Sequence, residues 1–578
     1  MTEKQTLPKV KEKNIPRKIA YFSMEIAANF SIPTYSGGLG ILAGDTIKSF
    51  ADLKVPAVAV TLLYKKGLFY QKLDNEGSQE ELPVEWNPEK YLKRLPQKVT
   101  VQIENKPVVI QAWQYDVSGV TGYCVPIIFL DSDLKENSEY HRGLTDHLYG
   151  GDERYRLAQE IILGIGGVRM LNELGYPDIK KYHMNEGHSG LLTLELLKNT
   201  RDQNEQEIRK EKDPITDYDF DYDAVRNLCV FTTHTPVAAG HDSFPYDLVE
   251  DVLGDFVPLN VLKMCAGENR LNMTLLALNL SKYTNGVAKK HGEVSRKMFP
   301  GYAIGAITNG VHSHTWTSES FRELYDQHIP GWEKDNFILR HASRIPKHEI
   351  WEAHIKAKKK LIDYVNENNG TKFDPGVFTI GFARRVTGYK RFDFIFSDIY
   401  RLLNIAGTVG KIQIVFAGKA HFRDGHGRDM IKKMFDHFQQ VKPNIKAVFL
   451  ENYDAELGKL LTSGVDLWLN TPQKPNEASG TSGMKAAHNG VPSLSTLDGW
   501  WIEGFIDGVT GWAIESDANT IQDEALDMYN KLEYIIIPMF YKDREKWINI
   551  MQQSISVNAS YFNTQRMVQE YILDAYFC

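Results

Sequence analysis

Short apolar runs that alternate with helical patterns constrain the fold of this chain more than any other feature. An apolar run at residues 19–24 leads into a glycine-rich turn at 36–40, a helical pattern over about 41–53, and a second apolar run at 55–63. Strand, turn, helix and strand in this order form a βαβ unit, which requires a parallel sheet. Four further apolar runs that end in polar or glycine residues are expected to be central strands of this sheet: 125–130, 181–184, 228–233 and 304–308.

A second series of the same kind follows a charge-rich helical stretch at 347–369. Its apolar runs, at 377–383, 411–417, 447–450 and 465–469, again alternate with helices. This pattern is typical of a doubly wound domain. Because 578 residues are too many for one core, the predicted class is α/β with two Rossmann-like doubly wound lobes. Ligands are expected in the cleft between the lobes.

The pattern also predicts where the parts of the chain begin and end. We expect a flexible N-terminus (1–17), an N-terminal lobe (18–345), a helical linker (346–374), a C-terminal lobe (375–545) and C-terminal helices (546–578) that pack back toward the first lobe. Residues 157–174 are expected to form one long buried helix. Residues 200–222 are charged and show no apolar period, which predicts an exposed insertion.

Composition excludes several classes of partner. A net charge of -7 gives no reason to expect nucleic acid or an anionic membrane surface. No apolar run approaches the ~20 residues that a membrane span needs, and residues 1–18 lack the apolar region of a secretory signal.

The four cysteines are far apart and form no C-x-x-C pair, which favours a reducing, cytoplasmic location. His183 and His188 do not have the spacing of a helical zinc site, so no metal is predicted.

The segment 477–490 (EASGTSGMKAAHNG) contains the strongest candidate for chemistry. Small and hydroxyl residues lead into a short helix, where unpaired N–H groups and the helix dipole favour a phosphate or another oxyanion. Lys485 lies in the first turn, where burial and the positive field are both expected to lower its pKa. A neutral lysine beside a phosphate cradle is what a Schiff base with pyridoxal 5′-phosphate requires. Taken alone, however, the segment is explained as simply by a glycine-rich turn with a solvated lysine.

Two other loops are candidates for phosphate binding. Residues 382–391 (FARRVTGYKR) directly follow a predicted strand, and Arg385 and Lys390 are suited to clamp one phosphate. A solvated basic loop is the alternative, but the position at the carboxyl end of a strand favours binding. The turn at 36–40 resembles a phosphate-approach loop without the full G-x-G-x-x-G spacing.

Polar side chains also close the predicted strands of the first lobe and are suited to bind sugar hydroxyls: Asn185, Glu186, His188, Thr233, His234, Thr235 and Asn309. A structural role is the more common explanation of a lone histidine such as His234. No pair of carboxylates stands out as the acid and nucleophile of a glycosidase, although such pairs meet only in the fold.

Together these motifs resemble those of the α-glucan (glycogen, starch and maltodextrin) phosphorylases. Residues 477–490, followed by Leu497-Asp498-Gly499, resemble that family's pyridoxal-phosphate lysine motif, and 384–391 resemble its basic phosphate motif. Residues 36–40 are similar to its N-terminal glycine loop. The segments 185–188, 233–235 and 308–310 follow in the family's order, and the resemblance extends over about residues 19–512.

The resemblance implies a GT-B architecture of two Rossmann-like lobes with the active site in the cleft between them. It implies a reversible, retaining reaction in which inorganic phosphate releases glucose 1-phosphate from the non-reducing end of an α-1,4-glucan. Pyridoxal 5′-phosphate would be held as an imine on Lys485, and its phosphate would relay a proton. A homodimer is expected.

The resemblance also implies a role for individual residues. The cofactor phosphate would be held by Arg384, Thr481, Ser482 and Gly483, in a pocket lined by Tyr453 and Trp316. The substrate phosphate would be held by Arg385, Lys390 and the amide of Gly38. The sugar ligands would be His234, Asn309, Tyr389, Glu477, Ser479 and Gly480, with Glu186 and His188 beside them. Lys485, Arg385, Lys390 and the backbone carbonyl of His234 are the expected catalytic groups.

The chain departs from the family pattern on the acceptor side. Thr387 and Gly388 stand where longer members have a histidine and a carboxylate, and 311–316 (VHSHTW) lack paired arginines. Two alternatives stay open. A nucleotide-sugar glucosyltransferase of the glycogen-synthase type shares the two-lobed fold but does not need the lysine segment. A non-catalytic glucan-binding protein would be expected to have lost Lys485, Arg385, Lys390 or Glu477, which are all present.

Overall fold

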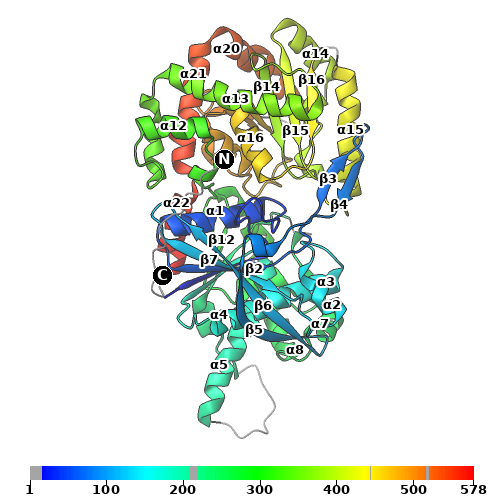
Figure 1. Ribbon diagram of the computed structural model, residues 1–578, viewed down its shortest axis with the longest axis vertical. Helices are drawn as coiled ribbons and strands as arrows, with labels where there is room; N and C mark the ends of the chain where they lie inside the picture. The colour runs from blue at the N-terminus through cyan, green and yellow to red at the C-terminus, as the bar shows by residue number, and fades with distance from the viewer. Residues whose placement is uncertain (1–15, 209–218, 238–239, 443, 516–519, 578) are drawn as a thin grey trace.

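The computed structural model describes residues 16–208, 219–237, 240–442, 444–515 and 520–577, which form two α/β lobes, one above the other (Figure 1). The described residues of the first lobe contain a nine-stranded sheet in the order β13-β12-β9-β8-β1-β2-β7-β6-β5. Strands β13 to β7 of this order are parallel, and β6 and β5 add an antiparallel edge. The strands are β1 (Ile19–Ser23), β2 (Ala57–Leu62), β5 (Lys93–Ile103), β6 (Lys106–Ser118), β7 (Cys124–Asp131), β8 (Lys181–Asn185), β9 (Cys229–Thr232), β12 (Tyr283–Gly286) and β13 (Gly305–Ala306).

The second lobe has the strand order of a doubly wound dinucleotide-binding fold. In the described residues its six strands are parallel, in the order β16-β15-β14-β17-β18-β19. They are β14 (Phe378–Ala383), β15 (Ile412–Ala417), β16 (Lys446–Leu450), β17 (Leu467–Asn470), β18 (Ser493–Thr496) and β19 (Gly511–Ile514). The order in which successive strands are added to the sheet reverses between β14 and β17, and ligands bind at such a switch point. The predicted class of two doubly wound lobes is therefore confirmed.

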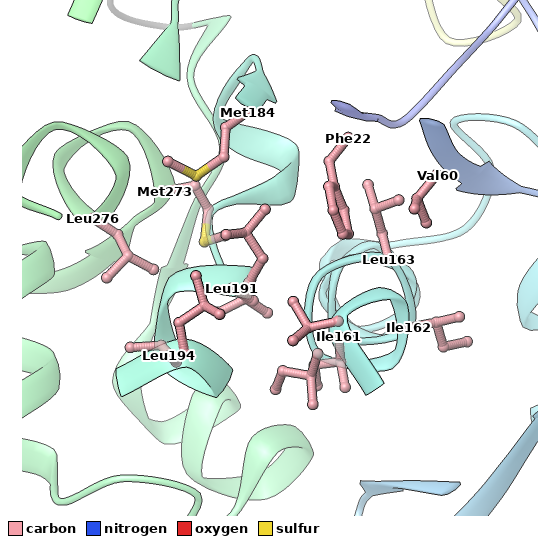
Figure 2. Packing of buried hydrophobic residues seen from close by; sticks show 14 of the residues in the cluster. Phe22, Val60, Ile161, Ile162, Leu163, Met184, Leu191, Leu194, Met273 and Leu276 are labelled. Carbon is pink, nitrogen blue, oxygen red and sulfur yellow. The ribbon is translucent and has the colours of Figure 1, made fainter. Parts of the chain in front are cut away.

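The helix beneath the first sheet is less regular than its sequence predicts. Residues 157–174 form the end of α3 (Glu153–Ile161), a π-helical segment (Ile162–Gly166) and α4 (Gly167–Glu173). Figure 2 shows how the side chains of this helix pack against Phe22 and Val60 of the sheet. A Cβ atom at Gly167 would lie 2.5 Å from Cε1 of Phe22, so the glycine permits this close packing. The predicted long buried helix is therefore present, with a π-helical segment in its middle.

A second difference concerns the charged stretch at 200–222. Helix α5 (Leu192–Ile208) continues through the first part of the predicted insertion, where Glu, Gln and Arg are good helix formers. Residues 209–218 lie outside the described residues, as does most of the predicted flexible N-terminus. None of the helices in the described residues combines the length and the apolar character that crossing a membrane requires.

The C-terminal helices return to the first lobe. After α21 (Arg544–Gln553), helix α22 (Thr564–Tyr571) lies against α1 (Gly38–Asp52), as Figure 1 shows. The hydroxyls of Ser49 and Thr564 are 2.6 Å apart. The Tyr571 hydroxyl lies 3.1 Å from Thr232 Oγ1 at the end of β9. The chain end thus stabilises the strand that leads into the candidate site.

A buried ion pair fixes helix α13 (Lys347–Asn369) to the second sheet. Asp466 accepts hydrogen bonds from Lys358 Nζ (2.5 Å), His354 Nε2 (2.9 Å) and the Thr379 amide (2.7 Å). Asp466→Ala would leave the Lys358 ammonium buried without a counter-charge, and we expect a loss of about 3–5 kcal/mol in the free energy of unfolding. Chemical denaturation measures this loss. The control is Asp363→Ala on the exposed face of the same helix, which should change stability little; equal effects of the two variants would contradict the prediction.

Candidate active site

The candidate site lies where loops from the two switch points come together. In the second lobe, β14 ends at Ala383 and leads into residues 384–391, called the basic loop below. Strand β17 ends at Asn470 and leads toward Glu477. Because these strands are neighbours and parallel, both loops leave the same edge of the sheet. In the first lobe, β1 and β8 are also neighbouring parallel strands. The chain after β1 leads to the glycine turn and the chain after β8 leads into Glu186, so both leave the same edge of that sheet.

Lys485 lies in helix α17 (Ser482–Ala487), with its ammonium 3.7 Å from the centroid of the Trp316 ring. Burial lowers the pKa of Lys485 to about 8. Trp316 donates its indole N–H to Asp45 Oδ2 of α1 at 2.6 Å, so the first lobe fixes the ring that covers the lysine. Lys419 and Lys459 also have a pKa of about 8, so the lowered pKa alone does not identify a functional lysine. The position of Lys485 in a short helix beneath an indole distinguishes it from them.

Glu477 holds two cations of the basic loop. Its Oε2 atom accepts a hydrogen bond from Arg384 Nη2 at 2.8 Å and another from Lys390 Nζ. Burial alone would raise the pKa of Glu477, but Lys390 and Arg384 lower it below its ordinary value. The structure thus brings together residues that the sequence assigned to three different ligands. Arg385, the next residue of the loop, is exposed.

Several hydrogen-bonding groups in this region are unused. In the described part of the chain, Nε and Nη1 of Arg384 and Oγ of Ser479 are buried without a hydrogen-bond partner. Buried polar groups are normally paired, and free guanidinium N–H groups are suited to a phosphate. A Cβ at Gly480 would lie 3.2 Å from Cγ of Glu477, and one at Gly483 would lie 2.7 Å from Cζ2 of Trp500. Gly480 has a φ of 77°, and Gly483 packs against the Trp500 ring, so backbone conformation at the first position and packing at the second both favour glycine.

The remaining second-lobe candidates make the following contacts. The ammonium of Lys390 lies 4.5 Å from the centroid of the Tyr389 ring. Ser482 Oγ accepts the indole N–H of Trp468 at 3.1 Å. Burial raises the pKa of Tyr453 to about 12, and the charge of Arg384 opposes that rise. Thr481 directly precedes α17 and makes no side-chain capping bond to it. The residues present therefore fit a phosphate-bearing pyridoxal cofactor on Lys485.

In the first lobe, Glu186 organises the loop that carries His234. Its Oε2 atom accepts hydrogen bonds from the His234 amide (2.8 Å) and the Thr235 hydroxyl (2.9 Å), and Oε1 accepts one from the Gly187 amide (2.9 Å). The backbone of Glu186 has φ of 80°, a conformation that is unfavourable for a residue with a side chain and is common at functional sites. His234 Nε2 lies 2.6 Å from Asn185 Oδ1. Both oxygens of Glu186 are thus engaged within the protein.

Burial favours the neutral form of two histidines on this side, His234 and His188. It lowers the pKa of His234 and of His188 to about 4. His188 Nδ1 and Asn309 Oδ1 are buried without a hydrogen-bond partner among the described residues, so each is available to a ligand hydroxyl.

The glycine turn is held by a residue that the sequence did not suggest. Glu25 Oε2 accepts the amides of Ser36 (2.5 Å) and Gly37 (3.2 Å), and Tyr149 donates its hydroxyl to Oε1 at 2.8 Å. A Cβ at Gly38 would meet nothing within 4 Å, so the backbone there faces open space. The available signal for Glu25 was its position directly after the first strand. Asp45, which holds Trp316, was also missed.

Asp498 is expected to make the stability of the fold depend on pH. It accepts the amides of Glu477 and Gly499, each at 2.9 Å, and burial raises its pKa to about 6. Because the folded state binds this proton more tightly than the unfolded state does, this group destabilises the fold as the pH rises from about 4 to 6. We expect Asp498→Asn to gain stability relative to the wild type over that range. Urea denaturation at several pH values tests this, with exposed Asp507→Asn as the control; a difference independent of pH would contradict it.

Two doubly wound lobes, a lysine covered by Trp316, and two buried cations that share Glu477 after β14 are the features of a two-lobed α/β enzyme. Comparison with known proteins identifies the family. The carbohydrate phosphorylase family model matches residues 34–116 and 257–506. A maltodextrin phosphorylase from Thermococcus litoralis is 38% identical, over 96% of this chain and 70% of its own length. Glycogen phosphorylases from Aquifex aeolicus and Mycobacterium tuberculosis are each 34% identical, over 97% and 96% of this chain and 86% and 70% of their own lengths.

The chain therefore belongs to the carbohydrate phosphorylase family, and the resemblance predicted from its motifs is confirmed. The matched ranges include the glycine turn, the basic loop and the lysine segment. The segments with Glu186 and His234 lie between the two matched ranges.

Proposed function

We propose that this protein is an α-1,4-glucan phosphorylase. It would use inorganic phosphate to release α-D-glucose 1-phosphate from the non-reducing end of a glycogen or maltodextrin chain, reversibly and with retained configuration. The observation that carries the proposal is the buried cluster of Arg384, Lys390 and Glu477 in the same lobe as a covered Lys485, in a chain of this family. The relatives named maltodextrin phosphorylase and glycogen phosphorylase support the same activity.

The second lobe would hold the cofactor. Lys485 would anchor pyridoxal 5′-phosphate, and its phosphate would lie on Arg384, Thr481, Ser482 and Gly483, with Tyr453 and Trp316 lining the pocket. When bound, this cofactor supplies a phosphate group that can exchange a proton with inorganic phosphate. The unpaired N–H groups of Arg384 support this assignment because a cofactor phosphate would satisfy them.

The substrates would lie between the lobes. Inorganic phosphate would be held by Lys390, Arg385 and the amide of Gly38. The glucosyl unit would be held by His234, Asn309, Tyr389, Glu477, Ser479 and Gly480, with Glu186 and His188 beside it. Because Glu186 fixes the amide of His234, it also fixes the neighbouring backbone, whose carbonyl would face the positive charge that develops on the sugar. Burial of Lys390, Asn309 and Ser479 would help to exclude water and favour transfer to phosphate over hydrolysis.

Phosphate-dependent release of glucose 1-phosphate from maltodextrins of graded length tests the proposal. We expect release to require both glucan and phosphate, and the length series would distinguish maltodextrin from glycogen as the preferred substrate. Glucosyl transfer from a nucleotide sugar without phosphorolysis would support the glucosyltransferase alternative instead. Glucan binding without turnover would support the non-catalytic one. Light scattering of the purified protein tests the homodimer that the resemblance implies.

A further inference from the structure

A hairpin of the first lobe reaches across to the second lobe. It consists of β3 (Tyr70–Leu73) and β4 (Gln79–Leu82), and Figure 1 shows it beside helix α15 (Gly425–Val441). At its tip, a Cβ at Gly77 would lie 2.4 Å from Cδ2 of Phe435 on α15. Gly77 has φ of 81°, so the turn needs glycine both for its conformation and for this contact. The hairpin therefore packs directly on the second lobe.

Two glutamines of the hairpin bind the backbone of the second lobe. Gln71, which is fully buried, donates Nε2 to the Gly418 carbonyl at 2.8 Å and accepts the Asn452 amide at 2.9 Å. Gln79 donates Nε2 to the Ala420 carbonyl at 2.8 Å and accepts the Ala420 amide at 3.1 Å. The two side chains also bond to each other, from Gln71 Nε2 to Gln79 Oε1 at 2.9 Å.

The backbone that they bind also supports the basic loop. The Arg384 amide donates to the Ala417 carbonyl at 3.2 Å, and the Val386 amide donates to the Lys419 carbonyl at 3.0 Å. A Cβ at Gly418 would lie 2.2 Å from the Arg384 carbonyl oxygen, so these segments touch. Residues 417–420 thus lie between the hairpin on one side and the start of the basic loop on the other.

We propose that Gln71 and Gln79 are positioning residues that fix the basic loop, residues 384–391, for binding of inorganic phosphate. The inference rests on the proposed function, in which this phosphate lies between Gly38 of the first lobe and Lys390 and Arg385 of the second. The width of such a site depends on how the lobes are placed relative to each other. The hairpin is a first-lobe element bonded to the backbone beneath the second-lobe loop, so it fixes that placement.

The test uses Gln79→Ala and Gln79→Met, a neutral side chain of similar length that cannot donate to the Ala420 carbonyl. The control is Glu80→Ala, an exposed neighbour on the same strand. Inorganic phosphate binding is measured by calorimetry, and KM for phosphate and for maltodextrin by phosphorolysis. We expect both Gln79 variants to weaken phosphate binding and raise its KM by roughly tenfold, with a smaller change for glucan and none for Glu80→Ala.

Unchanged phosphate affinity in the two Gln79 variants would overturn the inference, as would equal increases in both KM values. The outcomes are distinguishable from failure of the proposed function. If the wild type binds phosphate but releases no glucose 1-phosphate, the proposed function fails and calorimetry still decides the role of Gln79. Should Gln79→Ala not fold, Gln79→Met decides the role of Gln79.

Discussion

Lys485→Ala is expected to remove both the absorbance band of lysine-bound pyridoxal and the phosphorolysis activity. The side chain lies beneath Trp316 and its pKa of about 8 leaves a substantial neutral fraction near neutral pH, as attachment of an aldehyde cofactor requires. Loss of a single transition-state donor costs an enzyme ~10²–10³-fold, so loss of the whole cofactor should lower activity by at least about 10³-fold. Absorbance spectra and release of glucose 1-phosphate measure the two effects.

Lys459→Ala is the matched control. Burial lowers the pKa of Lys459 to about 8 as well, but this lysine lies on α16 (Ala455–Gly464) rather than on α17. The control variant should keep both the absorbance band and most of the activity. A band that persists in Lys485→Ala, or that disappears in Lys459→Ala, would refute the assignment of the cofactor to Lys485.

Local sequence patterns predicted the elements that form the two switch points. The runs at 19–24, 181–184 and 377–383 correspond to β1, β8 and β14, which carry site loops at their carboxyl ends. Their apolar periodicity is a local property that burial on both faces imposes, so it can be read without the fold. The predicted helix at 347–369 has the same bounds as α13, because it ends at Gly370 in the left-handed conformation.

Strands that can be recognised only from their pairing with other strands were not predicted from the sequence. Strands β5 and β6 are antiparallel, half-buried and rich in polar residues, so they lack the continuous apolar runs of the parallel strands. The β3–β4 hairpin consists largely of charged and amide side chains, and the role of Gln71 is visible only through contacts with residues more than three hundred positions away.

The candidate site also contains residues that the local sequence predicts and residues that it does not. The lysine segment is continuous in sequence, so its chemistry could be recognised from its own residues. The partners that fix it could not: Trp316 is held by Asp45, and the glycine turn by Glu25, through side-chain contacts that no spacing predicts. Spacing also could not predict that one carboxylate, Glu477, would bind both Arg384 and Lys390.

Glu477→Gln is expected to destabilise the protein and to increase its response to phosphate. The substitution removes the counter-charge of two buried cations, Arg384 and Lys390, and loss of one partner from a buried ion pair costs about 3–5 kcal/mol. Inorganic phosphate would restore a negative charge at the same place. The melting temperature should therefore fall in the absence of phosphate and rise more on phosphate addition in the variant than in the wild type.

Glu524→Gln separates this effect from the general cost of breaking an ion pair. Glu524 is also buried and binds Arg391, the last residue of the basic loop, at 2.5 Å. Arg391 also donates to the Thr471 carbonyl at 2.6 Å, so its side chain is directed to the protein rather than to a ligand. Both variants should melt at lower temperature, but only Glu477→Gln should show the larger phosphate response. An equal response in the two variants would mean that phosphate does not bind beside Glu477, because a phosphate bound elsewhere would stabilise both to the same extent.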